Sequence, residues 1–388
     1  MNGIVSKVFF FTSASKRAVS ITTIRNIFTK EYLGMEFLTK KHNESRVEAG
    51  QNILKIKYNI MTSYKRKGIK NLRKYGIQNY MGLVDCEKDM ANLSIIVEDF
   101  LAHPGDFKDK TRMLCNCIQT CYLRRDLKYS RILSEGAFFQ YFDKHPIAQL
   151  THLQILYDHG HYQELVDKYK KLTKVKNAAQ MAIVMAALCK IGTQEAYKQA
   201  TEIKKLDEIL MPKEVEGGRP QELFAWFSIQ MGHYDIAIET LRKKKQPSTV
   251  NEKLKGVKAS SKSRANIILF ALVKSGNVEI CLSDMSNELK NYTKFGFTPV
   301  YSSELIQEIA EAVKHDEKLS ETYKELPNDL EEKGKVENAT VEDMVFRPID
   351  RSPHSVASDQ AFTNPYYYQK DFRALGRKSK DYPNFKYL

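Results

Sequence analysis

A run of lysine and arginine residues without acidic partners is the strongest chemical signal in the sequence. No aspartate or glutamate occurs between Glu48 and Asp85. Within this stretch, the cations that we expect to act together are Lys65, Arg66, Lys67, Lys70, Arg73 and Lys74. Such side chains bind phosphate groups, and the release of counterions from a nucleic acid then contributes affinity without base-specific contacts. A solvated basic helix face is the other interpretation of the same residues.

Tyrosines are interleaved with these cations. They are Tyr58, Tyr64, Tyr75 and Tyr80. An aromatic ring beside cations offers a stacking surface for the bases of a single-stranded nucleic acid. Tyrosines also commonly lie half-buried, with the ring packed in the core and the hydroxyl group near water. The sequence leaves both interpretations open.

Residue types that support metal or catalytic chemistry occur without the partners that they need. The cluster of Cys115, Cys117 and Cys121 lacks a second cysteine or histidine pair at zinc-binding spacing. His42 and Glu44 match one half of a zinc deaminase motif, but the Pro-Cys-x-x-Cys half is missing from the sequence. The glycine-rich loops of nucleotide enzymes are missing too. We therefore predict a protein that is not an enzyme and has no cofactor and no metal site.

Helices are the elements that we expect to position these side chains. From residue 88 to 326, the prolines fall between apolar periodic stretches, where a missing N–H group does no harm. The recurring plan is an apolar helix, a tight turn and a more amphipathic helix. In four of the pairs, a glycine in the turn supplies the backbone conformation that ends the first helix. These glycines are Gly160, Gly192, Gly232 and Gly276. Because one helix pair cannot bury its apolar face alone, the pairs are predicted to stack into an all-α solenoid.

Two stretches within these helix pairs indicate which type of helical repeat is present. Residues 187–192, Ala-Leu-Cys-Lys-Ile-Gly, with the following Glu195 and Ala196, resemble the junction between the two helices of a pentatricopeptide repeat. Residues 265–277 resemble the first helix of the same repeat. The expected fold is therefore an α-solenoid of degenerate pentatricopeptide-like helix-turn-helix repeats. In that family the position held here by Asn116 and Asn266 faces an RNA base, so the resemblance makes both residues candidates for RNA contact.

The resemblance implies a non-catalytic protein that binds single-stranded mitochondrial RNA and takes part in messenger RNA processing or maturation. Separate RNA-processing enzymes would then be its partners. The position aligned with the two asparagines is Leu150, Ala182 or Glu222 in other repeats, which departs from a code of one base per repeat. The alternative function is a scaffold that binds other proteins, including a subunit associated with the mitochondrial ribosome.

The first residues have the composition of an import signal. Residues 1–33 are expected to be a mitochondrial targeting presequence, because the first thirty combine serines, threonines and apolar residues with five cations and no acid. Cleavage is expected between about residues 25 and 35, and the mature protein is expected in the mitochondrial matrix. A basic tail without a targeting role is the alternative interpretation.

Four segments follow from these observations. After the presequence, residues 36–87 form a basic helical region, residues 88–326 the repeats, and residues 327–388 a polar tail with prolines and tyrosines. The tail is expected to be irregular because it lacks helical periodicity. Membrane insertion is not expected, since the longest apolar run, Met181 to Cys189, is far shorter than the roughly 18 residues that a membrane-spanning helix needs.

Overall fold

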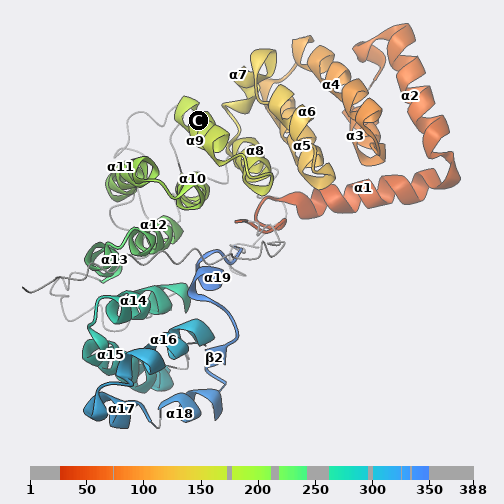
Figure 1. Ribbon diagram of the computed structural model, residues 1–388. Helices are drawn as coiled ribbons and strands as arrows, with labels where there is room; N and C mark the ends of the chain where they lie inside the picture. The colour runs from red at the N-terminus through yellow and green to blue at the C-terminus, as the bar shows by residue number, and fades with distance from the viewer. Residues whose placement is uncertain are drawn as a thin grey trace, which may run out of the picture.

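The computed structural model describes residues 27–72, 74–172, 177–210, 218–242, 262–295, 300–324, 326–332 and 334–348. Most of this chain is helical (Figure 1). Strands β1 (Tyr301–Ser302) and β2 (Val336–Glu337) form a short parallel pair. The prediction of an all-α protein is confirmed. Within the described ranges, helices long and apolar enough to cross a bilayer are absent.

The N-terminal arm of the molecule consists of helices α1 to α8. Their bounds are α1 Met35–Ala49, α2 Ile53–Lys67, α3 Lys74–Leu83, α4 Glu87–Ala102, α5 Phe107–Arg124, α6 Leu127–Ile132, α7 Phe139–Phe142 and α8 Pro146–Asp158. Short 3₁₀ turns lie at η1 Gly50–Asn52, η2 Ile69–Asn71 and η3 Gly136–Phe138. Helix α1 runs along one side of this arm to α2 at its far end (Figure 1).

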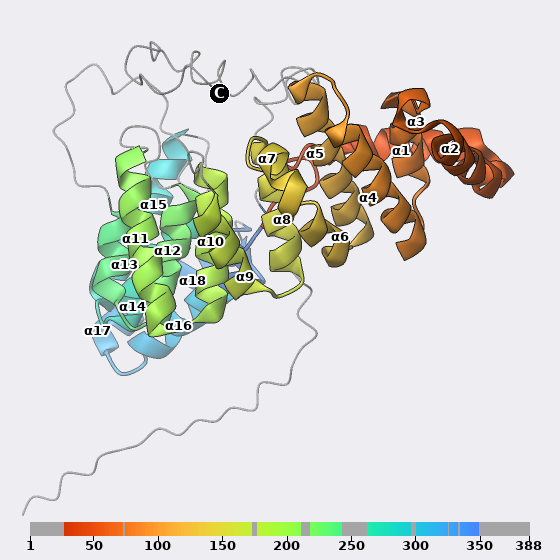
Figure 2. The ribbon, with the colours of Figure 1, turned by 90° about the horizontal axis from the view of Figure 1, so that it is seen from above.

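The C-terminal arm consists of the remaining helices. Their bounds are α9 Tyr162–Lys171, α10 Ala178–Ile191, α11 Gln194–Leu210, α12 Arg219–Gln230, α13 Tyr234–Leu241, α14 Lys262–Lys274, α15 Val278–Phe295, α16 Ser303–Val313, α17 Glu317–Tyr323, α18 Leu326–Glu332 and α19 Val341–Val345. The two arms meet at an angle near α8 and α9 (Figures 1 and 2).

One row of helices continues through both arms. We call α5, α8, α10, α12, α14 and α16 the inner row, because each contacts the next. Helices α9, α11, α13 and α15 pack on one side of this row, away from α19 (Figure 1). Helix α10 is apolar around its whole circumference, and Met181 to Cys189 are all buried because α8, α9, α11 and α12 surround it.

Local signals set the ends of these helices, as the sequence predicts. Asn177 caps α10, since its Oδ1 accepts a hydrogen bond from the backbone N–H of Gln180 at 2.8 Å and the Gln180 side chain accepts one from the Asn177 N–H. Gly192 ends the same helix with φ of 68°. Gly160, Gly232 and Gly276 adopt positive φ in the other predicted turns.

Both predicted outer segments contain buried residues where the structure describes them. The irregular tail was expected from residue 327, yet Val341, Val345 and Phe346 are buried around α19, and α19 packs on α12 and α14. The presequence was expected to extend to residue 33, yet Phe28 and Leu33 are fully buried. Residues 1–26 and 349–388, which carry the rest of both expectations, lie outside the described residues.

Replacement of Gly232 by alanine tests the importance of the predicted turns. Gly232 has φ of 79°, and a Cβ atom there would meet no neighbour within 4 Å, so the cost comes from backbone conformation alone. We expect Gly232→Ala to lower the free energy of unfolding by about 1 kcal/mol. Urea denaturation measures this value. Gly105→Ala is the control, because Gly105 lies outside the positive-φ region and a Cβ atom there would make only an ordinary contact with Lys110 Cε at 3.9 Å. An equal loss in both variants would contradict the explanation.

Candidate nucleic-acid interface

The predicted cations gather at the end of α2 and in η2. Lys65, Arg66 and Lys67 form the last turn of α2, Lys70 lies in η2, and all four side chains are exposed. Arg73 lies outside the described residues, and Lys74 begins α3 with a side chain that is not described. Within the described chain, Lys65, Arg66 and Lys70 form no ion pair. The end of α2 therefore presents positive charge to solvent.

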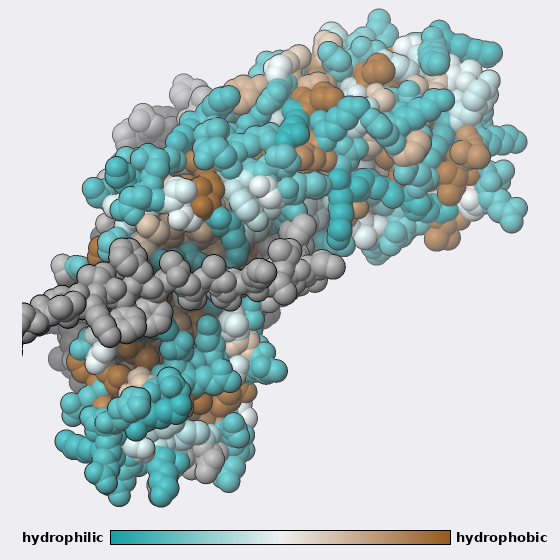
Figure 3. Space-filling model, viewed as in Figure 1, coloured by the Kyte–Doolittle hydropathy of each residue, from teal (hydrophilic) through white to brown (hydrophobic). Residues whose placement is uncertain are grey.

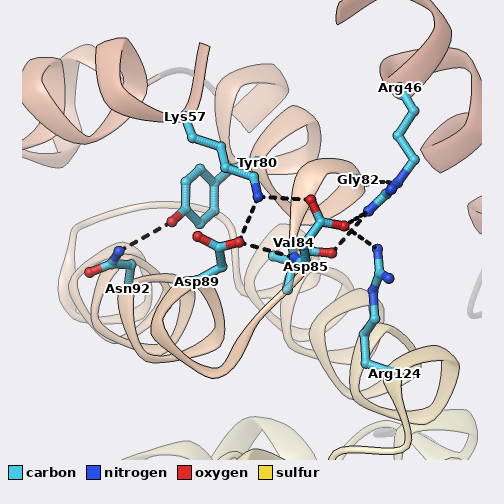
Figure 4. A network of polar contacts seen from close by, with 9 residues as sticks. All are labelled: Arg46, Lys57, Tyr80, Gly82, Val84, Asp85, Asp89, Asn92 and Arg124. Carbon is cyan, nitrogen blue, oxygen red and sulfur yellow. Dashed lines mark hydrogen bonds and ion pairs between the residues drawn. The ribbon is translucent and has the colours of Figure 1, made fainter. Parts of the chain in front are cut away.

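Lys57, from the same acid-free run, has a structural role. Its Nζ lies 2.6 Å from Asp89 Oδ2 and 2.9 Å from Asp85 Oδ2 (Figure 4). Only about 8% of the Lys57 residue is exposed. The sequence argument missed this role because both acids lie beyond the end of the run. Lys57 is thereby removed from the set of cations available to a polyanion.

Asp85 extends this contact to two other helices. It pairs with Arg46 of α1, and Arg124 of α5 lies 3.7 Å away (Figure 4). Arg46 also donates to the carbonyl oxygens of Gly82 at 2.9 Å and Val84 at 3.1 Å. The network joins α1, α2, α4, α5 and the loop between α3 and α4. Helix α2 is therefore attached to its neighbours through the buried pair of Lys57 and Asp89 and through the more exposed Asp85.

Electrostatics within the network favour the charged forms. Burial opposes the charge on Asp89, but the hydrogen bonds from Lys57 and from the backbone N–H of Asp85 outweigh it and lower the pKa of Asp89. The pKa of Lys57 is raised, since Asp89 and Asp85 overcome the desolvation of its ammonium group. Both groups are ionised at neutral pH, so the pair persists under physiological conditions.

The tyrosines divide into one exposed ring and two that are used internally. Tyr58 is 69% exposed on α2. Tyr64 donates a hydrogen bond to Asp99 of α4, and burial together with this carboxylate raises the pKa of Tyr64 to about 12. Tyr80 is fully buried and accepts a hydrogen bond from Asn92 at 3.3 Å. The side chain of Tyr75 is not described. Of the described tyrosines in this run, Tyr58 offers a ring for stacking.

The two candidate asparagines are in different environments. Asn116 lies half-buried on α5, and its backbone carbonyl oxygen accepts a hydrogen bond from the Thr120 hydroxyl group at 2.8 Å. Asn266 on α14 is fully buried; its amide donates to Val300 O at 2.9 Å and accepts from Ser302 N at 2.8 Å. The predicted contact of Asn266 with an RNA base is therefore wrong, because its amide holds the chain before α16.

Two segments of the same chain, residues 27–35 and 341–346, pack against inner-row helices on the side opposite α11, α13 and α15. Gln119 of α5 donates to Leu33 O at 2.8 Å, and Gln154 of α8 accepts from Phe28 N at 3.2 Å. In the C-terminal arm, Lys190 of α10 pairs with Glu342 at 2.6 Å and lies 4.3 Å from the Phe346 ring centre. The inner row thus binds segments from both ends of its own chain.

The cysteine cluster, His42 and Trp226 lie in the interior of the protein. Cys115, Cys117 and Cys121 are buried, and burial raises the pKa of Cys115 to about 12. Burial, together with nearby Arg124, lowers the pKa of His42 to about 4, so its ring is neutral at pH 7. Trp226 packs near Phe270, with ring centres 5.9 Å apart. Across the described chain, no three His, Cys, Asp or Glu side chains gather in a metal-binding arrangement.

The surface near α1 and α2 also carries apolar side chains. Val47 at the end of α1 is 82% exposed, and Leu54 at the start of α2 is 80% exposed. Apolar groups are visible at this end of the molecule among mostly hydrophilic residues (Figure 3). A pocket of about 790 Å³ lies along α1, lined by residues that include Glu36, Lys40, Glu44 and Val47.

Comparisons with known proteins add no relative to this picture. No family model, no curated protein and no solved structure matches the chain.

Replacement of Asp89 by asparagine tests the buried ion pair. At pH 7 we expect Asp89→Asn to lower the free energy of unfolding by about 1–3 kcal/mol, because Lys57 loses a charged partner. The pKa of Asp89 is lowered in the folded state. Its stabilising effect is therefore present above the unfolded pKa of about 4 and disappears as the pH falls through the folded value. Urea denaturation from pH 7 down to about pH 2.5 should show the difference between variant and wild type shrinking below about pH 4.

The exposed pair of Glu87 and Lys128 supplies the control for this prediction. Glu87→Gln should leave the free energy of unfolding close to the wild-type value, because solvent screens an exposed pair. Equal losses in the two variants at pH 7 would contradict a special role for Asp89.

Proposed function

We propose that the protein is a non-catalytic, mitochondrial RNA-binding protein that acts in the processing or maturation of mitochondrial messenger RNA. In this proposal, single-stranded RNA binds along the exposed basic end of α2 and η2. The observation that carries it is the group Lys65, Arg66 and Lys70, exposed and without ion pairs in the described chain. Three cations held without acids attract a polyanion more strongly than they attract a protein surface of mixed charge.

The proposed fold is an α-solenoid of degenerate pentatricopeptide-like repeats. Support comes from the contacts of each inner-row helix with the next and from the turn glycines that end α8, α10, α12 and α14. In this proposal the repeats serve mainly as a rigid support. The RNA strand lies on the N-terminal arm, since the inner row of the C-terminal arm already holds α19.

Tyr58 gives the proposed RNA path a stacking surface. It lies on α2, as do Lys65 and Arg66, and its ring is largely exposed. A base stacked on tyrosine gains affinity for any sequence, which fits a protein whose repeats lack a regular base code. The matrix location and the RNA-processing enzymes as partners rest on the N-terminal composition and on the family resemblance.

A protein-binding scaffold, including a subunit associated with the mitochondrial ribosome, is the second candidate function. Val47 and Leu54 favour it, because two large apolar side chains exposed near each other along the chain are typical of protein contacts. The inner row also binds backbone groups of residues 28 and 33 through Gln154 and Gln119. This function predicts binding that depends on Leu54 and changes little with salt concentration.

Salt-dependent RNA binding decides between the two functions. We expect the protein to bind single-stranded RNA with an affinity that falls as salt rises. The triple variant Lys65→Ala, Arg66→Ala, Lys70→Ala should reduce the slope of log affinity against log salt by about 2, since each lost phosphate contact contributes roughly 0.7. Fluorescence anisotropy with a labelled oligonucleotide measures the slope.

The control for the charge change removes three exposed cations elsewhere. Lys170, Lys171 and Lys205 lie exposed on α9 and α11. Their simultaneous replacement by alanine changes the net charge equally and should leave the slope near the wild-type value. RNA binding that is absent, or that falls equally in both triple variants, would favour the scaffold.

Tyr58 provides a separate test of the RNA path. We expect Tyr58→Ala to weaken RNA binding by about 1–3 kcal/mol without a change in the salt slope, because stacking is lost while the cations stay. Tyr58→Phe keeps the ring and should bind as wild type. The affinity and slope of both variants are measured with the same oligonucleotide. Unchanged affinity in Tyr58→Ala would show that no base stacks on this residue.

A further inference from the structure

We infer that the protease that removes the presequence cuts the chain before Ile27. Residues 27–35 then remain in the mature protein as part of its core. This inference rests on the proposed mitochondrial location. It moves the mature N-terminus away from residue 33, the boundary that composition suggested. The argument depends on burial, on hydrogen bonds to two other helices and on the placement of charge.

The side chains of residues 27–35 fill the interior of the N-terminal arm. Ile27 is 2% exposed, and Phe28, Leu33 and Met35 are fully buried within the main hydrophobic core. The Phe28 ring stacks on Tyr32 with centres 4.6 Å apart. Cleavage after residue 33 would remove three of these four apolar side chains and leave a cavity in a close-packed core.

Backbone groups of this segment complete the hydrogen bonding of buried side chains. The Gln119 amide, 5% exposed on α5, donates to Leu33 O, and the fully buried Gln154 on α8 accepts from Phe28 N. Loss of the segment would leave Gln119 without this carbonyl acceptor in the interior. An unsatisfied buried polar group is costly, so these contacts are a feature of the folded protein that a discarded presequence would not have.

The segment also starts helix α1. Leu33 N donates to Thr29 O at 3.2 Å, and Met35 N donates to Lys30 O at 2.9 Å. Gly34 has φ of 69° and directs the chain into α1. These local bonds form a turn that precedes the long helix leading to the basic end of α2. A cut inside the turn would free the first residues of α1.

Residues 1–26 alone carry the basic, acid-free composition that import requires. Lys7, Lys16, Arg17 and Arg25 all precede that residue, and the first acid of the sequence is Glu31. Residues 1–26 therefore keep the cationic, acid-free character of a presequence. The same cut that preserves the core removes nearly all of the targeting composition.

Identification of the mature N-terminus tests the inference directly. The full chain with a C-terminal epitope tag is expressed in cultured cells, recovered from mitochondria, and its N-terminal peptide is determined by mass spectrometry. We expect that part of residues 1–26 has been removed and that the first remaining residue is Ile27 or an earlier one. A first residue at Phe28 or later would overturn the inference while leaving the mitochondrial location intact. Recovery of the intact chain outside mitochondria would overturn both.

Substitutions in the full-length protein test the core role independently of import. We expect Phe28→Ala and Leu33→Ala each to lower the midpoint of thermal unfolding by several degrees, because each leaves a cavity. Glu31→Ala is the matched control, since Glu31 is exposed within the same segment, and it should keep the wild-type midpoint. Midpoints unchanged in the Phe28 and Leu33 variants would overturn the assignment of this segment to the core. A variant too unstable to purify supports it when Glu31→Ala is recovered normally.

Discussion

Apolar side chains on the inner-row helices must be covered on more than one side, and this constraint shapes the whole molecule. A helix such as α10, buried around its circumference, is stable only between neighbours. The neighbouring pairs supply part of the cover. The chain's own ends supply another part, with residues 27–35 against α5 and α8 and residues 341–346 against α12 and α14. The two outer segments are therefore components of the fold.

The same constraint separates the candidate interface from the repeats. Where polypeptide already occupies the inner row, side chains such as Asn266 hold backbone groups and are closed to a ligand. The basic end of α2 is far from this cover, at the free end of the N-terminal arm (Figure 1). The contacts of Lys57 with Asp85 and Asp89 fix the position of α2 (Figure 4). The cations at the end of the helix are exposed to solvent. Because this support holds the backbone of α2 in place, binding a polyanion there needs little ordering of the backbone.

Features decided by neighbouring residues were predictable from the sequence, and features decided by distant ones were not. The cap of Asn177 and Gln180 and the turn at Gly192 are local, so helix ends could be predicted. Trp226 is buried in a largely apolar helix, which is again a local pattern. Lys57 and Asn266 were different, because their partners at Asp89 and Ser302 lie beyond any local pattern. In the same way, the order around α19 depends on helices more than a hundred residues earlier in the chain, at α12.

The position of α19 has a consequence for biosynthesis. Ribosomes make Val341 to Phe346 long after α12 and α14, so the apolar surface that these residues cover stays open in every nascent chain until Phe346 has left the ribosome. Exposed apolar surface of this kind attracts chaperones and promotes aggregation. Premature stop codons shortly before Val341 would thus yield proteins that contain the described helices from α1 to α18 and that quality-control proteases nevertheless recognise as incomplete.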